Sequence, residues 1–130
     1  MNYINPDNED ELINFYREWK SNYPDVTRTG KNKVKETRLG LKPPSITTMR
    51  ILYAYATQGD IPGESLVAIL QNSLYDAFNT ASQEEVDLIP STLQYVTMYL
   101  PGESFGNSEK YGKWINKMRK TKSGRPTDFY

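Results

Sequence analysis

The chain has 130 residues and a net charge of zero at neutral pH, and it contains neither cysteine nor histidine. The missing cysteine excludes disulfide bridges, thiolate zinc sites, iron–sulfur clusters and cysteine nucleophiles. The missing histidine removes the commonest general base, the commonest metal ligand and the usual pH-sensitive group.

The charges fall into blocks whose sign alternates along the chain. The net charge is −4 over residues 1–26, +6 over 27–50, −7 over 51–108 and +5 over 109–130. The third block holds seven acidic residues and no Lys or Arg. Segregation of this kind indicates charged surfaces, which are either solvated or in contact with partners.

A first helix is predicted over residues 8–22, because Leu12, Phe15 or Tyr16, Trp19 and Tyr23 recur at three- to four-residue spacing. Residues 25–44 are predicted to form an irregular basic connection that ends at a Pro-Pro pair. A structureless segment of that length is unusual inside a compact domain, so we expect it to be functional or flexible.

A second helix is predicted from Ser45 to about Thr57, and a third over residues 62–79 as one continuous amphipathic segment. The inward-facing side chains expected in the third helix are those of Leu66, Ile69, Leu70, Leu74, Ala77 and Phe78. We expect these two helices to form the central helical hairpin.

Ser82 and Glu85 have the spacing of a capping box, which predicts a short helix that stops at Pro90. Residues 92–100 suit a strand by composition and a helix by spacing, and we interpret them as a helix. A last helix is predicted over 108–120. The fold class is therefore mainly α. We expect one small bundle of five to six helices over residues 1–120, with a basic loop at 27–44 and a basic, aromatic tail at 121–130.

The aromatic side chains divide into expected core and expected surface. Spacing predicts that Trp19, Tyr53, Tyr75, Phe78 and Trp114 are buried. Tyr95 and Tyr99 are expected to reach the surface if residues 92–100 are helical, because aromatic residues are enriched at interfaces.

Two basic groups are the candidate binding residues, and we expect them to contact partner subunits of an assembly or the phosphates of nucleic acid. Binding to a second copy of the chain and simple solvation remain open. The first group is Arg28, Lys31, Lys33, Lys35, Arg38 and Lys42. The second is Lys113, Lys117, Arg119, Lys120, Lys122 and Arg125, followed by a terminal apolar pair, Phe129 and Tyr130, that could anchor in a partner or simply fray.

Three other chemistries are weakly supported. Gln58-Gly59-Asp60 between two helices resembles a helix-turn-helix, but its second helix carries Glu64 and Asp76 and no cation to approach DNA. Thr29-Gly30-Lys31 lacks the remaining residues of a phosphate-binding loop. The acids Glu84, Glu85, Asp87, Glu103 and Glu109 form no spaced catalytic motif.

No apolar run approaches the roughly 20 residues that span a bilayer, and the acidic N-terminal segment does not resemble a secretory signal. We therefore expect a cytoplasmic or intravirion protein without cofactor, metal or membrane partner. The predicted function is that of a non-enzymatic accessory or assembly protein, such as a viral or phage structural protein. The alternative is a nucleic-acid-binding regulator or DNA-packaging factor, and a carboxylate-based metal-dependent enzyme is less favoured.

Overall fold

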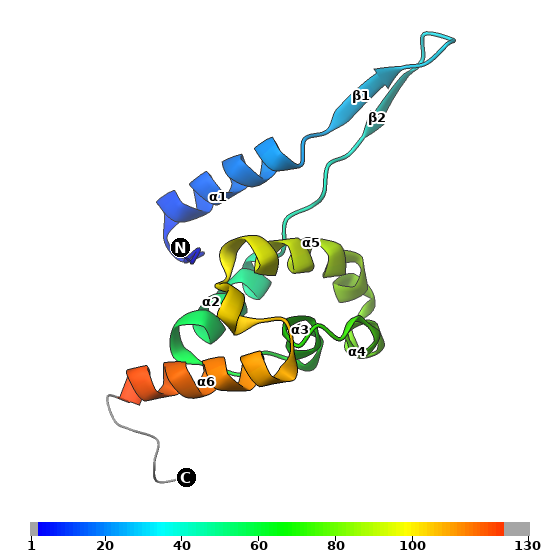
Figure 1. The fold of residues 1–130 in the computed structure, drawn as a ribbon. Coiled ribbons are helices and arrows are strands. Elements are labelled where there is room, and N and C mark those ends of the chain that lie inside the picture. Colours follow the sequence, from blue (N-terminus) through cyan, green and yellow to red (C-terminus); the bar gives the residue numbers. More distant parts are fainter. Residues whose placement is uncertain (1–2, 124–130) are drawn as a thin grey trace.

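The computed structural model describes residues 3–123, and it describes the side chains of residues 3–120. Its elements are α1 (Glu9–Asn22), β1 (Val26–Thr29), β2 (Lys35–Arg38), α2 (Ile46–Gln58), α3 (Glu64–Leu70), α4 (Leu74–Thr80), α5 (Gln83–Tyr99), the 3-10 turn η1 (Gly102–Ser104) and α6 (Ser108–Ser123) (Figure 1). The prediction of a small, mainly helical domain is confirmed, and the structure adds an antiparallel hairpin. None of the helices in the described range is long and apolar enough to cross a membrane.

Helix α2 forms the centre of the core and packs on α6. The ring of Tyr55 stacks on that of Tyr111 at 5.6 Å, and its hydroxyl donates a hydrogen bond to the Ser104 carbonyl oxygen over 2.5 Å. Burial, and then the neighbouring Tyr111, raise the pKa of the Tyr55 hydroxyl. Helix α2 ends at Gly59, whose φ of 71° is left-handed. Helix α6 also comes close here, so that a Cβ on this residue would lie 2.8 Å from the Ile115 carbonyl oxygen.

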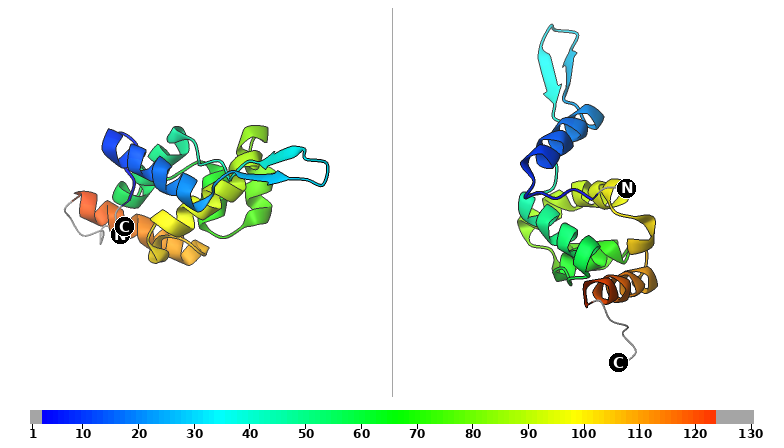
Figure 2. Two further views of the ribbon diagram at one scale, coloured as in Figure 1. Left: turned by 90° about the horizontal axis from the view of Figure 1, so that it is seen from above. Right: turned by 90° about the vertical axis from the view of Figure 1, so that its left-hand side faces the viewer.

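Helix α1 lies beside α5 (Figures 1 and 2). A cluster of aromatic rings joins the two helices. The ring of Phe15 meets those of Tyr95 and Tyr99 edge-on, at 5.5 and 5.3 Å. Phe15, rather than Tyr16, is the buried member of the predicted stripe. The expectation that Tyr95 and Tyr99 reach the surface is wrong, because α1 covers both of them.

The predicted continuous helix over residues 62–79 is also wrong, because the chain breaks after Leu70. Asn72 adopts a left-handed conformation with a φ of 61°, which asparagine tolerates better than most residues. The amides of Asn72 and Ser73 donate to the carbonyl oxygens of Ile69 and Ala68, and this pair of bonds is the Schellman ending of α3. The break changes the direction of the following helix, so Tyr75 and Phe78 are exposed and not in the core.

Residues 83–99 form one helix, so the predicted stop at Pro90 is wrong and the helical interpretation of 92–100 is right. The capping box of Ser82 and Glu85 is present as predicted. Pro90 lies on the exposed side, where the missing amide costs least, while Ile89, Tyr95 and Val96 are buried. The buried stripe therefore holds the helix together across the proline.

Candidate functional site

The basic connection is a β-hairpin that projects from the helices, so the prediction of an irregular segment over 25–44 is wrong. Strand β1 pairs antiparallel with β2, with Val26 opposite Arg38 and Thr29 opposite Lys35. Every residue of both strands is exposed, and neither strand packs extensively on a helix within the described residues. All three ribbon views show the hairpin extending beyond the body (Figures 1 and 2). We call residues 26–38 the arm.

A three-residue loop closes the arm. The Lys33 amide donates to the Gly30 carbonyl oxygen over 3.0 Å, and the Gly30 amide donates to the Val34 carbonyl oxygen over 2.9 Å. Lys33 has a φ of 61°, the left-handed position that glycine usually occupies in such loops. A lysine therefore stands at the tip of the arm at a cost of about 1 kcal/mol in backbone energy.

The base of the arm is held firmly against α1. The Asp25 carboxylate accepts the Gly40 amide hydrogen over 2.7 Å, and the Trp19 indole nitrogen donates to the Leu41 carbonyl oxygen over 2.7 Å. The two chain segments approach so closely at Gly40 that a Cβ there would lie 1.9 Å from the Tyr23 carbonyl oxygen. These contacts set the direction in which the arm leaves the body.

The arm has two faces, because side chains alternate along a strand. The first face carries Val26, Arg28, Val34, Glu36 and Arg38, and the second carries Thr27, Thr29, Lys35 and Thr37. The hydroxyls of Thr27 and Thr37 share a hydrogen bond of 3.2 Å across the strands. Within the described part of the chain, no ion pair joins any cation of the arm to an acid, so these charges face solvent.

The second basic group lies on α6, at the end of the body opposite the arm (Figures 1 and 2). Lys113 pairs with Glu109 over 2.8 Å, and its hydrogen bond lowers the pKa of that carboxyl. Lys117 pairs with Glu103 over 2.9 Å and lies 5.2 Å from the ring centre of Trp114. Arg119 donates to the Gly59 carbonyl oxygen over 3.3 Å. These cations therefore help to hold the fold.

The remaining predicted site residues are only partly described. Lys120 lies on α6 and makes contacts within the chain, and Lys42 is exposed just beyond the arm. The backbone of Lys122 is helical, whereas Arg125, Phe129 and Tyr130 lie outside the described residues. The structure thus separates the two basic groups and does not combine them into one surface.

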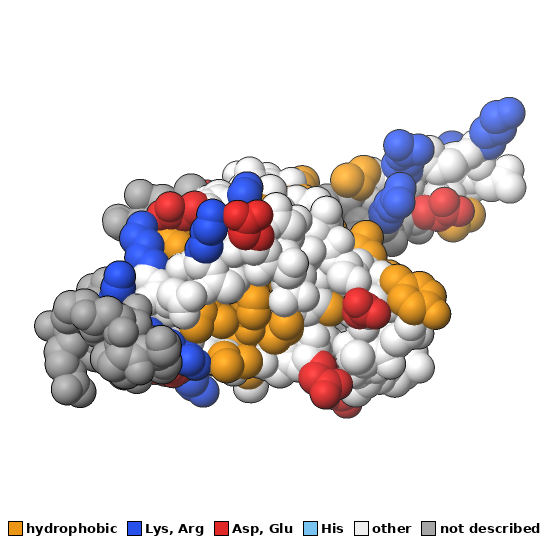
Figure 3. Space-filling view, turned by 60° about the horizontal axis from the view of Figure 1, so that its bottom comes forward, with side chains coloured by type: hydrophobic (Ala, Val, Ile, Leu, Met, Phe, Trp, Pro, Cys, Tyr) orange, Lys and Arg blue, Asp and Glu red, His pale blue; other side chains and the backbone are white. Residues whose placement is uncertain are grey.

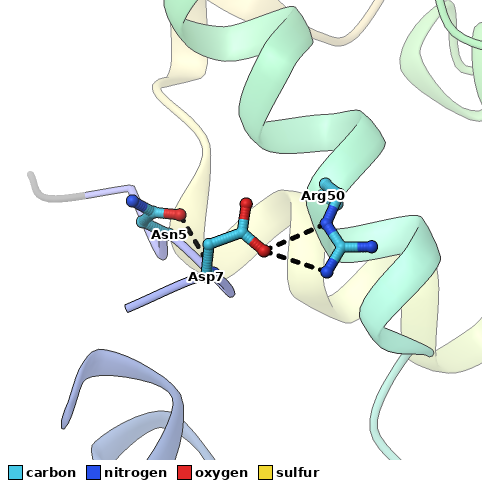
Figure 4. A network of polar contacts seen from close by, with 3 residues as sticks. All are labelled: Asn5, Asp7 and Arg50. Carbon is cyan, nitrogen blue, oxygen red and sulfur yellow. Dashed lines mark hydrogen bonds and ion pairs between the residues drawn. The ribbon is translucent and has the colours of Figure 1, made fainter. Parts of the chain in front are cut away.

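Arg50 shows how differently a cation of the same charge block behaves outside the arm. Its guanidinium donates twice to one Asp7 oxygen, over 2.9 and 3.1 Å, and the Asp7 amide in turn donates to the Asn5 side chain over 3.1 Å (Figure 4). The pair joins the N-terminal segment to α2. Arg50 is therefore bound within the chain, unlike the cations of the arm.

The helix-turn-helix interpretation is not supported by the structure. Its second helix is α3, which has seven residues, and five of them are buried: Ser65, Leu66, Ala68, Ile69 and Leu70. A helix covered on most sides cannot present a face to a DNA groove.

The candidate acids also have structural contacts. Ser65 and Ser82 donate hydrogen bonds to Glu85 and lower the pKa of its carboxyl. Glu103 and Glu109 pair with lysines of α6. No group of three acidic side chains in the described region is arranged to hold a metal ion.

One surface was not predicted from the sequence, because its residues were assigned to the core. Leu74, Tyr75 and Phe78 of α4 are 42, 79 and 51 % exposed. On another side of α4, a groove of about 360 Å³ between α3 and α4 is lined by Ile61 and Val67 together with two acids, Glu64 and Asp76. This surface was missed because the helical break at Asn72 was not predicted from the sequence. Figure 3 shows the right-hand part of the body with acidic and hydrophobic side chains and no cation, whereas cations lie on the arm and toward the opposite end.

Comparisons with protein-family models, with characterised proteins and with solved structures find no match to this chain. The arm and the surface of α3 and α4 are therefore the features of the molecule that bear on its function.

Proposed function

We propose that the protein is a non-enzymatic assembly subunit whose basic arm docks on an acidic surface of a partner protein. The observation that carries this proposal is an exposed two-stranded hairpin that projects from a helical body. An isolated hairpin of two strands is at best marginally stable in water, because it buries too little apolar surface. The arm adds nothing to the core, and contact with a partner is the simplest reason to keep it.

Charge identifies the kind of partner. Residues 26–42 carry six cations and one acid, Glu36, and none of these cations forms an ion pair within the described chain. Complementary charge speeds and orients docking between proteins. The exposed side chains of Val26 and Val34 on the same face add apolar surface that excludes water from such a contact. An acidic surface with apolar patches fits this arm best.

Nucleic acid is a second candidate partner, favoured by three lysines at the tip: Lys31, Lys33 and Lys35. Two-stranded ribbons enter DNA grooves in several protein families, and lysines there neutralise phosphates. Such binding would weaken steeply as the salt concentration rises.

An arm-less variant tests the proposal. Val26 and Arg38 face each other, so residues 27–37 can be replaced by an Asn-Gly turn that suits a two-residue hairpin loop. We would compare its light-scattering mass with that of the intact chain, with and without a short DNA duplex, between about 50 and 200 mM salt. Circular dichroism and the melting temperature control for folding.

We expect the arm-less chain to keep its helices and its melting temperature and to lose association. Loss of association in the absence of DNA supports a protein partner, and loss of a salt-sensitive duplex complex supports nucleic acid. A chain that unfolds without the arm would contradict the premise that the arm adds nothing to the core. A chain that associates as before would show that the arm is not a docking element.

A further inference from the structure

We infer that the acidic partner is a second copy of this chain, and that the arm of one copy docks on the α3–α4 surface of the next. This inference rests on the proposed function and names the partner. The surface consists of the groove lined by Ile61, Glu64, Val67 and Asp76, and of the exposed apolar side chains that α4 carries outside this groove, Leu74, Tyr75 and Phe78.

The arm and the groove have complementary patterns of charge and apolarity. Exposed Val34 shares the first face of the arm with the cations Arg28 and Arg38, and Lys33 and Lys35 are its neighbours along the chain. In the groove, apolar Ile61 and Val67 lie beside two carboxylates, Glu64 and Asp76. Opposite charges set around an apolar contact give both orientation and affinity.

The segment of the chain that forms the groove carries no cation. Residues 51–108, which include α3, α4 and α5, contain seven acids and no Lys or Arg. An approaching arm therefore meets only attractive charge from this part of the chain. Electrostatic steering of this kind speeds the encounter and weakens as the salt concentration rises.

Helix α4 shows by its exposure that it lacks a covering element. Of its seven residues, Ala77 is buried, whereas Leu74, Tyr75 and Phe78 are largely exposed. Large contiguous apolar patches are uncommon on soluble monomers and mark interaction sites. Tyrosine and phenylalanine are also enriched in the buried centres of interfaces.

The contact must join two molecules. The arm extends away from the body, and α3 and α4 lie on the far side of α5 from it (Figure 1; Figure 2, right). The contacts of Asp25 and Gly40 fix the base of the arm, so the arm cannot turn back onto its own groove. Because the arm and the groove are different surfaces, each copy can give one contact and receive another, in head-to-tail order.

A charge-swap experiment on the full chain tests this inference. The arm variant is Lys33→Glu with Lys35→Glu, and the groove variant is Glu64→Lys with Asp76→Lys. The mass of each variant is measured by light scattering at low salt over a range of concentrations. The two variants are then mixed in equal amounts.

Matched controls carry the same change in charge elsewhere. Arg17→Glu with Lys20→Glu controls for the arm variant, because both residues are exposed on α1. Glu9→Lys with Asp10→Lys controls for the groove variant, because these acids occupy the first turn of a helix, as Glu64 and Asp76 do. If the groove variant unfolds by circular dichroism, Glu64→Gln with Asp76→Asn replaces it in the self-association test.

We expect the intact chain and both controls to associate, and each swapped variant alone to associate about tenfold or more weakly. Mixing should restore association, because each arm whose tip has become acidic then meets a basic groove and each unchanged arm meets an acidic groove. A monomeric intact chain at low salt, or association that ignores the groove variant, would overturn the inference.

The outcomes separate this inference from the function on which it rests. Association that needs the arm and ignores Glu64 and Asp76 leaves the arm as a docking element with another site. A monomer whose arm binds a DNA duplex assigns the arm to nucleic acid. Association that survives loss of the arm refutes both.

Discussion

Replacing Phe15 with alanine should loosen α1, and with it the arm, from the body. Phe15 is fully buried, and its ring meets those of Trp19, Tyr95 and Tyr99 at 5.7, 5.5 and 5.3 Å. Truncation of a buried phenylalanine costs about 3–5 kcal/mol. Each lost aromatic pair adds about 0.5–1.5 kcal/mol beyond the area term, so we expect the upper end of that range.

A loss of that size lowers the melting temperature by roughly 10–20 °C for a domain of this length. Urea titrations followed by circular dichroism would measure the free energy of unfolding. Tyr16→Ala is the matched control, because this neighbouring aromatic residue is 37 % exposed and should cost about 1 kcal/mol. Equal losses for the two variants, or a loss below about 1 kcal/mol for Phe15→Ala, would refute the packing of α1 on α5.

Three further changes test local features. Lys33→Gly removes the left-handed strain at the tip, so the hairpin should become more stable by about 1 kcal/mol. The Gly30 amide hydrogen should then exchange more slowly with solvent, while the melting temperature of the body stays unchanged. Gly40→Ala places a Cβ against the Tyr23 carbonyl, so it should displace the base of the arm, cost about 1–3 kcal/mol and shift tryptophan emission to the red. Glu85→Gln should cost about 1 kcal/mol at neutral pH, the size of a cap contact. Because the folded pKa of Glu85 is lowered, its contribution is present above the ordinary value of 4.5 and is lost as the pH falls through the folded value, so melting curves of the two proteins should converge in acid.

The helical parts of the fold could be predicted because their signals are local. Polar caps and three- to four-residue spacing mark α1, α2 and α6, whose observed ends lie within three residues of the predictions. The capping box before α5 is equally local. The continuation of α5 past Pro90 is not a local feature. It depends on the burial of Tyr95 and Tyr99 beneath α1, which no short stretch of the sequence reveals.

The arm was missed because its strands lack the usual hydrophobic alternation. That alternation arises when one face of a strand is buried, and here both faces are exposed. The usable signal was a run of β-branched residues on each side of Gly30 and Asn32: Val26, Thr27 and Thr29 before them, Val34 and Thr37 after.

The groove was missed for a related reason. One left-handed residue, Asn72, separates α3 from α4 and changes which apolar side chains face inward. The basic residues of the arm were predicted as candidates from charge alone. Their separation from those of α6 required the three-dimensional arrangement.

The two tryptophans of the chain lie in different parts of this architecture. Trp19 is hydrogen-bonded to Leu41 at the base of the arm, whereas Trp114 is buried on the inner side of α6 with Lys117 beside its ring. Replacing either one with phenylalanine leaves a single fluorescent reporter. The emission of Trp19 then follows events at the arm and that of Trp114 follows the body, so engagement of a partner and unfolding of the domain can be timed separately without any added label.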